Sequence, residues 1–405
     1  MRGPVRGFSL TELLVAMVAS AVIAAGALGL VVAQQRAFTA SAGDRGLQET
    51  ARTALGELGM SLRRAGYGVE PWLALDFGPA NGAFANQSYP SGAPSAFPPS
   101  ASACTGADAV SCRDSVTGPD ELVFYARDPA FSRALAAAPT STRLTLATPL
   151  VNPLYQGQVL QVMCGGASRW AYVTVGAKAG PGDTAVALGT ASSGPFPYQQ
   201  DQLASGCFGA GWRDVLVLKV ERFHYYVARY SDGSGADRPY LLLDRGLWDG
   251  GAPLVEPVAP DVEDLQVSYL FPGSAVQRVG YAPGHRLVNA TAAASPDAAV
   301  DLSAAPPTYA DLSNAPSRAT NHPANVRAVR ISLVVRTATW DPQLAGAGGA
   351  TLPAAANRPA SGADGGYRRL LVETTEGVRN LDSRGPFYPS YSTNAGADGL
   401  NVGGG

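Results

Sequence analysis

The stretch that decides the fold is RGFSLTELLVAMVASAVIAAGALGLVVA, residues 6–33. From Phe8 to Ala33 the chain is almost wholly apolar for 26 residues and carries one charge, Glu12. At about 1.5 Å per residue, a helix of this length exceeds the roughly 30 Å hydrocarbon core of a bilayer. The preceding MRGPVRG holds two arginines and no acid, which places the start of the chain in the cytoplasm. The sequence therefore predicts one transmembrane helix, with the residues after Ala33 across the membrane.

This apolar run differs from a cleaved secretory signal peptide, whose apolar core has about 7–15 residues and is followed by a small-residue cleavage site. Its one carboxylate is unusual, because a charged side chain costs on the order of 2.5–3.5 kcal/mol at the bilayer centre and less near the interface. Two interpretations of Glu12 stay open from the residues alone. It has a functional partner, or it reaches water at the interface.

An amphipathic pattern continues the helix beyond the apolar run. Apolar residues recur at three- and four-residue spacings, with charged residues between them, which predicts one helix over residues 8–66. Gly66 and Gly68 flank Tyr67 as stop signals. Gly26 and Gly29 each cost about 1 kcal/mol relative to alanine but permit close helix approach. The residues expected to pack on a domain are Leu47, Ala51, Ala54, Leu55, Leu58 and Leu62.

The pattern of residues 67–405 predicts a single β-rich head domain. In Leu265, Val267, Tyr269 and Phe271 the apolar period is two, and Val329, Ile331, Leu333 and Val335 repeat it, which indicates strands with one buried face. Segments rich in Ala, Pro, Ser and Gly at about 69–118, 272–325 and 341–366 are expected to be surface connections, insertions or mobile loops. The predicted strands are residues 121–127, 143–148, 158–163, 170–175, 184–188, 215–229, 240–243, 265–271, 326–340 and 369–378.

Residues 6–14, RGFSLTELL, resemble the start of a type IV prepilin: a short basic leader ending in Gly, then an aromatic residue and an FSLTELL-type sequence. In that family a prepilin peptidase cleaves after the Gly and N-methylates the new terminus. The resemblance implies a leader at 1–7, cleavage after Gly7 and methylation of Phe8. It also assigns to Glu12 the neutralisation of a neighbouring subunit's terminal amine during assembly. Major pilins commonly have Pro where this chain has Gly29.

Later segments resemble PilW-family minor pilins in type and order: FHYYVAR (223–229), RPYLLLDRG (238–246), DVEDLQVSYLF (261–271), VRAVRISLVVRT (326–337) and EGVRNL (376–381). The resemblance implies an α+β, type IV pilin-like fold, with a long N-terminal helix, transmembrane and then amphipathic, packed on an elaborated antiparallel sheet.

The same resemblance implies a single-pass inner-membrane protein with a periplasmic head, which later reaches the cell surface at the pilus tip. The implied partners are prepilin peptidase, the inner-membrane assembly platform, the major pilin, other minor pilins and a PilY-type tip adhesin. Two alternatives remain open. A type II secretion pseudopilin of the GspJ kind shares the N-terminus and a β-rich head but is usually much smaller, and a signal-anchored adhesive or binding protein needs only the anchor.

Four cysteines lie on the translocated side of the predicted membrane helix: Cys104, Cys112, Cys164 and Cys207. An even count in an oxidising compartment indicates two disulfides among three possible pairings. We favour Cys104 with Cys112 and Cys164 with Cys207. The absence of a CxxC pair argues against a metal site.

Composition and motifs disfavour the other functional classes. A formal net charge of −2 without a basic cluster argues against nucleic-acid binding. The chain has no GxSxG, HExxH, P-loop or strand-linked GxGxxG, and we expect neither an enzyme nor a cofactor. His224 is expected to be a strand residue, and His285 and His322 are not spaced as ligands.

Several other groups have a structural and a functional interpretation. Asp261, Glu263 and Asp264 are expected to form a solvated turn rather than a cation site. DGSGAD, residues 232–237, resembles a calcium loop only loosely and reads better as a hairpin turn. Aromatic residues that could contact partners, but are expected to pack structurally, are Trp72, Trp248, Phe387 and Tyr388.

Overall fold

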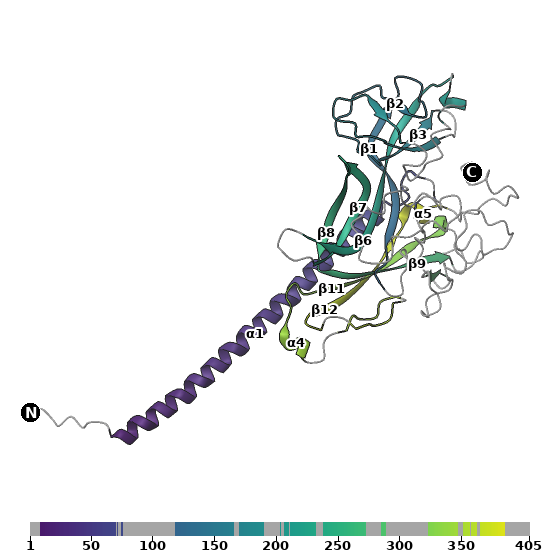
Figure 1. Ribbon diagram of the computed structural model, residues 1–405. Helices are drawn as coiled ribbons and strands as arrows, with labels where there is room; N and C mark the ends of the chain where they lie inside the picture. Colours follow the sequence, from purple (N-terminus) through teal and green to yellow (C-terminus); the bar gives the residue numbers. More distant parts are fainter. Residues whose placement is uncertain are drawn as a thin grey trace, which may run out of the picture.

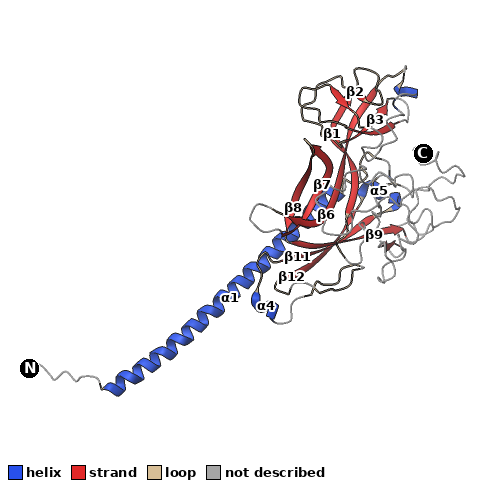
Figure 2. Ribbon diagram, in the orientation of Figure 1, coloured by secondary structure: helices blue, strands red, loops and turns tan. Residues whose placement is uncertain are grey.

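The computed structural model describes residues 9–69, 71, 74–75, 118–165, 170–189, 203, 206–209, 211–231, 238–272, 285–288, 323–346, 351–356, 358–362 and 365–384. Figure 1 shows a long helix, α1, that projects from a β-rich head and ends far from it at the N-terminus. Helix and strands are segregated along the molecule (Figure 2). This is the α+β arrangement, a long helix followed by antiparallel sheets, that the sequence predicts.

Helix α1 runs without interruption over Leu10–Leu62, 53 residues. The sequence predicted residues 8–66, and the helix ends four residues earlier because a turn begins at Arg63. Gly66 and Gly68 adopt positive φ angles of 76° and 67° within that turn, which a residue with a side chain rarely adopts. The predicted stop signal is confirmed.

The larger sheet has six strands in the order β4–β3–β6–β7–β8, with β1 paired to the other edge of β6. All the pairs are antiparallel. Along one edge of β6, residues 215–220 pair with β3 and residues 224–230 pair with β7. The strands are β1 (Leu122–Ala134), β3 (Val159–Cys164), β4 (Trp170–Thr174), β6 (Val215–Tyr230), β7 (Arg238–Asp249) and β8 (Ala252–Pro260).

A second antiparallel sheet has the order β10–β9–β11–β12, and a two-stranded sheet pairs β2 with β5. Short helices follow β11 and β12: α4 (Pro342–Gly346) and α5 (Arg379–Asp382). The strands are β2 (Arg143–Thr145), β5 (Ala185–Ala187), β9 (Val262–Pro272), β10 (His285–Val288), β11 (Ala328–Arg336) and β12 (Arg369–Gly377).

The main core lies between the C-terminal part of α1 and the two larger sheets. The predicted helix stripe is confirmed: all of its members are buried in this core except Leu55, which packs against it half-buried. The predicted strand positions Leu265, Val267 and Tyr269 on β9 are buried there too. So are Val329, Ile331, Leu333 and Val335 on β11.

A second hydrophobic cluster, here called the distal cluster, lies at the end of the head away from the N-terminal half of α1 (Figure 1). It fills the space between β2, β5, β3, β4 and the adjoining ends of β1 and β6. Strands β1 and β6 run from the main core into it, which joins the two cores. Its members include Leu144, Leu160, Val162, Val173, Val186, Phe208 and Val217.

Two strands were not predicted. β8 contains three prolines, which argued against a strand, but it lies at a sheet edge where a missing N–H is tolerated. β10 lies within the expected insertion at 272–325, as does the 3₁₀ turn Pro323–Asn325. The rest of that insertion and residues 76–117 of the first lie outside the described residues.

Candidate functional site

The start of α1 carries a reciprocal cap. The Glu12 N–H donates to Ser9 Oγ at 3.2 Å, and the Ser9 N–H donates to Glu12 Oε2 at 2.9 Å. This is a capping box, which satisfies two backbone donors at the helix terminus. The serine followed three residues later by glutamate was a signal for it that the sequence analysis did not use. Gly7 and Phe8 lie outside the described residues.

The N-terminal half of α1 makes no contact that buries it in this single chain. It is the one described helix that is long and apolar enough to cross a membrane, and its apolar window is wholly unburied. Large apolar side chains point outward over this half, among them Leu10, Leu14, Val18, Ile23 and Leu28. Burial of such a side chain away from water stabilises by about 1.5–3 kcal/mol, so this half needs lipid or other helices around it.

The C-terminal end of α1 is fixed to the head by polar contacts. Asn380 Nδ2, from α5, donates to the carbonyl oxygens of Arg63 and Ala65 at 3.2 and 3.0 Å. Arg64 Nη2 pairs with Glu221 Oε2 at 2.6 Å, and the buried Tyr225 hydroxyl donates to Ser61 Oγ at 2.8 Å. Carbonyls at a helix end lack intrahelical partners, so these contacts satisfy them and hold the helix in one orientation.

The carboxylates Asp261, Glu263 and Asp264 do not form the solvated turn that we expected. Asp261 and Asp264 are buried, and Asp261 has a positive φ of 57° at the junction of β8 and β9. Each carboxylate faces arginines, because buried charges need partners. The ion pairs are Asp261 with Arg238 at 3.3 Å and Arg336 at 3.8 Å, Glu263 with Arg336 at 3.4 Å and Arg369, and Asp264 with Arg358 at 2.7 Å.

Arg358 lies in the segment 341–366, which we expected to be an insertion or a mobile loop, and its contacts favour the insertion. Its side chain is 2% exposed, and it donates to Asp264 Oδ2 and to the Pro353 carbonyl, each at 2.7 Å. Burial raises the pKa of Asp264, although the Arg358 charge opposes this. Through Arg358, these contacts tie the Pro353 carbonyl to Asp264 on β9. Sequence reasoning missed the pair because 94 residues separate the two side chains.

His224 is a buried strand residue, as expected, but it belongs to a polar cluster. Its Nε2 lies 2.9 Å from Glu121 Oε2, and its Nδ1 lies 3.3 Å from Arg222 Nη2. Asp244 on β7 lies 3.8 Å from the same ring. The cluster lies where β6 changes partner from β3 to β7, so it joins the two halves of the larger sheet.

Among the residues that the structure describes, no three His, Cys, Asp or Glu side chains are grouped so that they could hold a metal ion. The carboxylates already face arginines, and this favours a structural role over acid–base chemistry. His322, Trp72, Phe387, Tyr388 and residues 232–237 lie outside the described residues, as does the side chain of His285. Trp248 is half-buried, and its backbone N–H donates to the Gln156 carbonyl at 3.0 Å.

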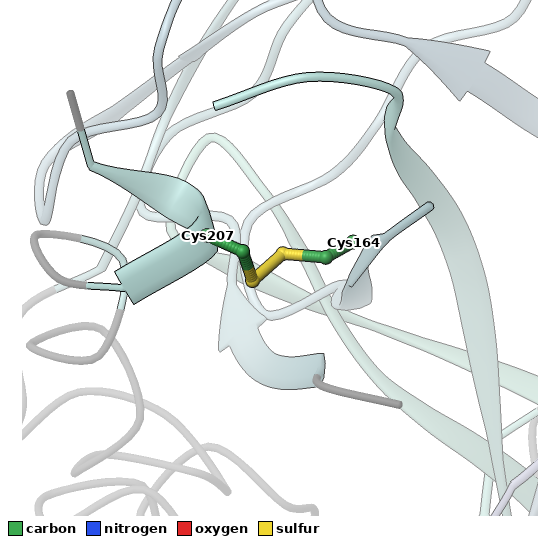
Figure 3. The surroundings of a disulfide bond; sticks show 2 residues. All are labelled: Cys164 and Cys207. Carbon is green, nitrogen blue, oxygen red and sulfur yellow. A yellow bond between two sulfur atoms is a disulfide. The ribbon is translucent and has the colours of Figure 1, made fainter. Parts of the chain in front are cut away.

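Cys164 and Cys207 form a disulfide with a Cα–Cα distance of 6.3 Å (Figure 3). This is the pairing that the sequence analysis favoured. It joins the end of β3 to the short 3₁₀ helix Gly206–Phe208, whose Phe208 is buried in the distal cluster. Cys104 and Cys112 lie outside the described residues.

Two family models match the chain. Residues 2–28 match the prokaryotic N-terminal methylation motif, and residues 224–380 match PilW, type IV pilus-assembly protein W. No curated protein sequence matches the chain. Among solved structures, a type IV-like pilin from Thermus thermophilus is 16% identical. That alignment covers 56% of this chain and 86% of the pilin at a TM-score of 0.18, too low for the two folds to be compared.

The matched regions agree with the geometry. The methylation motif covers the capped start of α1, and the PilW match covers most of the two sheets on which α1 packs. Together they imply membrane anchoring, contact with other pilins and with prepilin peptidase, and a structural rather than an enzymatic protein. The chain is thus similar to PilW-family proteins over residues 224–380 of its head and to prepilins at its N-terminus, and the two matches support a type IV pilus minor pilin.

Proposed function

We propose that prepilin peptidase cleaves this chain after Gly7 and methylates Phe8. The product then waits in the inner membrane with its head in the periplasm. From there it joins other minor pilins in a complex that primes pilus assembly, and it ends at the filament tip beneath a PilY-type adhesin. The assembly platform and the major pilin are its other partners. The observation that supports this best is the exposed apolar half of α1 on a chain with a methylation motif.

The proposed mechanism is packing rather than catalysis. Before assembly, lipid surrounds the apolar half of α1, and after assembly the helices of neighbouring pilins replace the lipid. Gly26 and Gly29 favour close approach there, because an added Cβ at either position meets nothing within 4 Å in the single chain. The room left at these glycines is available to a neighbouring helix.

We assign to Glu12 the setting of register in this transfer. In the single chain its carboxylate accepts only the Ser9 N–H among the described residues, so it keeps capacity for a further donor. A neighbouring subunit's terminal ammonium supplies that donor. In a helical bundle of low dielectric, the two charges attract strongly, while either one alone is penalised.

The test is to express Glu12→Ala and Glu12→Gln in cells and to measure the chain in sheared filaments and in membranes. We expect both variants to be cleaved and anchored but to be depleted from filaments roughly tenfold or more, since a lost ion pair of about 1.4 kcal/mol already gives a factor of ten. Glu49→Gln is the matched control, because it removes a charge from an exposed position of the same helix. Undiminished incorporation of Glu12→Gln would contradict the role of the carboxylate.

A further inference from the structure

One segment of the head lies at the end that faces the exposed half of α1. Residues 337–346, here called the membrane foot, leave β11 and include α4, which Figure 1 shows at the end of the head from which the N-terminal half of α1 projects. Two contacts fix its level along the helix. An added Cβ at Gly43 would lie 3.4 Å from Thr337 Cγ2, and Arg368 Nη1 pairs with Asp44 Oδ1 at 3.6 Å.

The membrane foot presents a large amphipathic side chain to the outside. Trp340 is 50% exposed, and its neighbours Ala338 and Thr339 are exposed and uncharged. The indole is held in place, because it lies so close to Gly366 that a side chain there would clash with it. The Asp341 N–H donates to the Gly366 carbonyl at 2.6 Å, which fixes the backbone as well. Such rings are typical of membrane interfaces, where one end is apolar and the other is wet.

Helix length brings this side chain toward the bilayer. The apolar run 8–33 is about 39 Å long as a helix, and the hydrocarbon core is about 30 Å thick. A tilt of about 40°, which is at the upper limit of observed tilts, buries the whole run in the hydrocarbon core. Gly43 lies ten residues after Ala33, about 15 Å further along the helix axis. At that tilt it lies only about 11 Å above the surface of the hydrocarbon core. A segment on the side of the helix that the tilt brings closer to the membrane then reaches the headgroup layer, which is about 5–8 Å thick.

We propose that the membrane foot rests in the headgroup layer of the bilayer that holds α1, with Trp340 as the interfacial anchor. The contact sets the direction in which the helix tilts, because the length of the apolar run allows a tilt but does not choose its direction. The inference rests on the membrane anchoring proposed above, and the foot must leave the lipid when the chain enters a filament.

The experiment uses the full chain in nanodiscs of phosphatidylethanolamine and phosphatidylglycerol, with or without a lipid that carries a nitroxide on its headgroup. Tryptophan fluorescence is compared between the wild type, Trp340→Phe and Trp212→Phe. Trp212 packs against the distal cluster, at the other end of the head, and is the matched control. The difference between wild type and Trp340→Phe isolates the emission of Trp340.

We expect the nitroxide lipid to quench the Trp340 emission strongly, so that Trp340→Phe loses most of the lipid-dependent quenching and Trp212→Phe loses none. In the Trp340→Phe background, Thr339→Trp moves the indole to an adjacent exposed position, and we expect it to restore quenching. Equal quenching in wild type and Trp340→Phe would overturn the proposal. A chain that does not enter nanodiscs at all would instead contradict the anchoring on which the proposal rests.

Discussion

Asp128 illustrates how single polar side chains hold the irregular parts of this head. It lies where the pairing of β1 with β6 shifts register, between Arg127 and Ser132. Its Oδ1 accepts the Ala130 N–H at 2.9 Å, and its Oδ2 pairs with Lys219 Nζ at 2.6 Å. Partial burial acts to raise the pKa of Asp128, but the contacts with Lys219 and Ala130 outweigh it and hold the pKa below the ordinary value. The ionised carboxylate therefore stabilises the bulge.

For Asp128→Asn we predict a loss of about 1–2 kcal/mol in the free energy of unfolding at pH 7. A group with a lowered folded pKa contributes stability above its unfolded pKa, 3.8, and loses it as the pH falls through the folded value. In urea unfolding, wild type and variant should therefore converge as the pH falls through the folded pKa of Asp128, which lies below 3.8. Asp249→Asn, which breaks an exposed pair with Lys178, is the control and should change little. An equal deficit at pH 7 and pH 2 would contradict this explanation.

At the same scale, the sequence assigns proposed roles to residues of one local motif but misses ion pairs between distant residues. Gly7, Phe8 and Glu12 belong to one local motif, and Ser9 with Glu12 forms a cap within four residues. The partners of Asp264 and Glu263 lie 94 and 106 residues away, and no spacing rule connects them. Charged residues near the start of a strand were therefore predicted to be solvated, although the fold buries them against arginines.

Among the elements, α1 was predicted best because its apolar spacing has one period over its whole packed length. In the second sheet, β9, β11 and β12 were predicted in place, but the burial of β9 and β11 was not. Their alternation indicated one buried face, yet Gln266 and Ser332 on the other face are buried as well. Arg358, in a segment whose composition had indicated an insertion or a mobile loop, pairs with Asp264 on β9. Gln266 donates to the Gly118 carbonyl and Ser332 to Glu373 Oε1, so contacts between residues distant in the sequence accompany this burial.

The packing of α1 gives a prediction with an internal control. Ala54 is fully buried against the head, so Ala54→Leu should overpack the contact and lower the free energy of unfolding by about 1–3 kcal/mol. Gly56 lies one half-turn further, where an added Cβ meets nothing within 4 Å, so Gly56→Ala should stabilise by up to about 1 kcal/mol. Urea unfolding of both variants measures this. A neutral Ala54→Leu would contradict the tight packing of helix on head.

The disulfide supports the distal cluster rather than the main core. Replacing Cys164 and Cys207 by alanine should cost about 2–4 kcal/mol, since the bond closes a loop with a sequence separation of 43 residues. Hydrogen exchange should accelerate in β3 and β4, which line the distal cluster, while β11 in the main core keeps its protection. Uniform acceleration across β3, β4 and β11 would show instead that the two cores unfold as one unit.

At the scale of the whole molecule, the residues that match the PilW family form a different part of the head from the residues that do not. The PilW match begins at residue 224, and the distal cluster is built almost wholly from earlier residues. The matched part contains the whole second sheet and, of the larger sheet, β7, β8 and the second part of β6, while β1, β3 and β4 lie before it. The architecture of the distal cluster could not be predicted from sequence, because its short strands and long connections give no period that fixes their pairing.

The most direct test of the minor-pilin account is mass spectrometry of the N-terminal peptide of the chain from sheared filaments and from membranes. We predict a chain in filaments that begins at Phe8 and carries one added methyl group. A methylated chain confined to membranes would contradict a place in the filament and favour a pseudopilin or a role in priming alone. A chain that still begins at Met1 would contradict processing as a prepilin altogether.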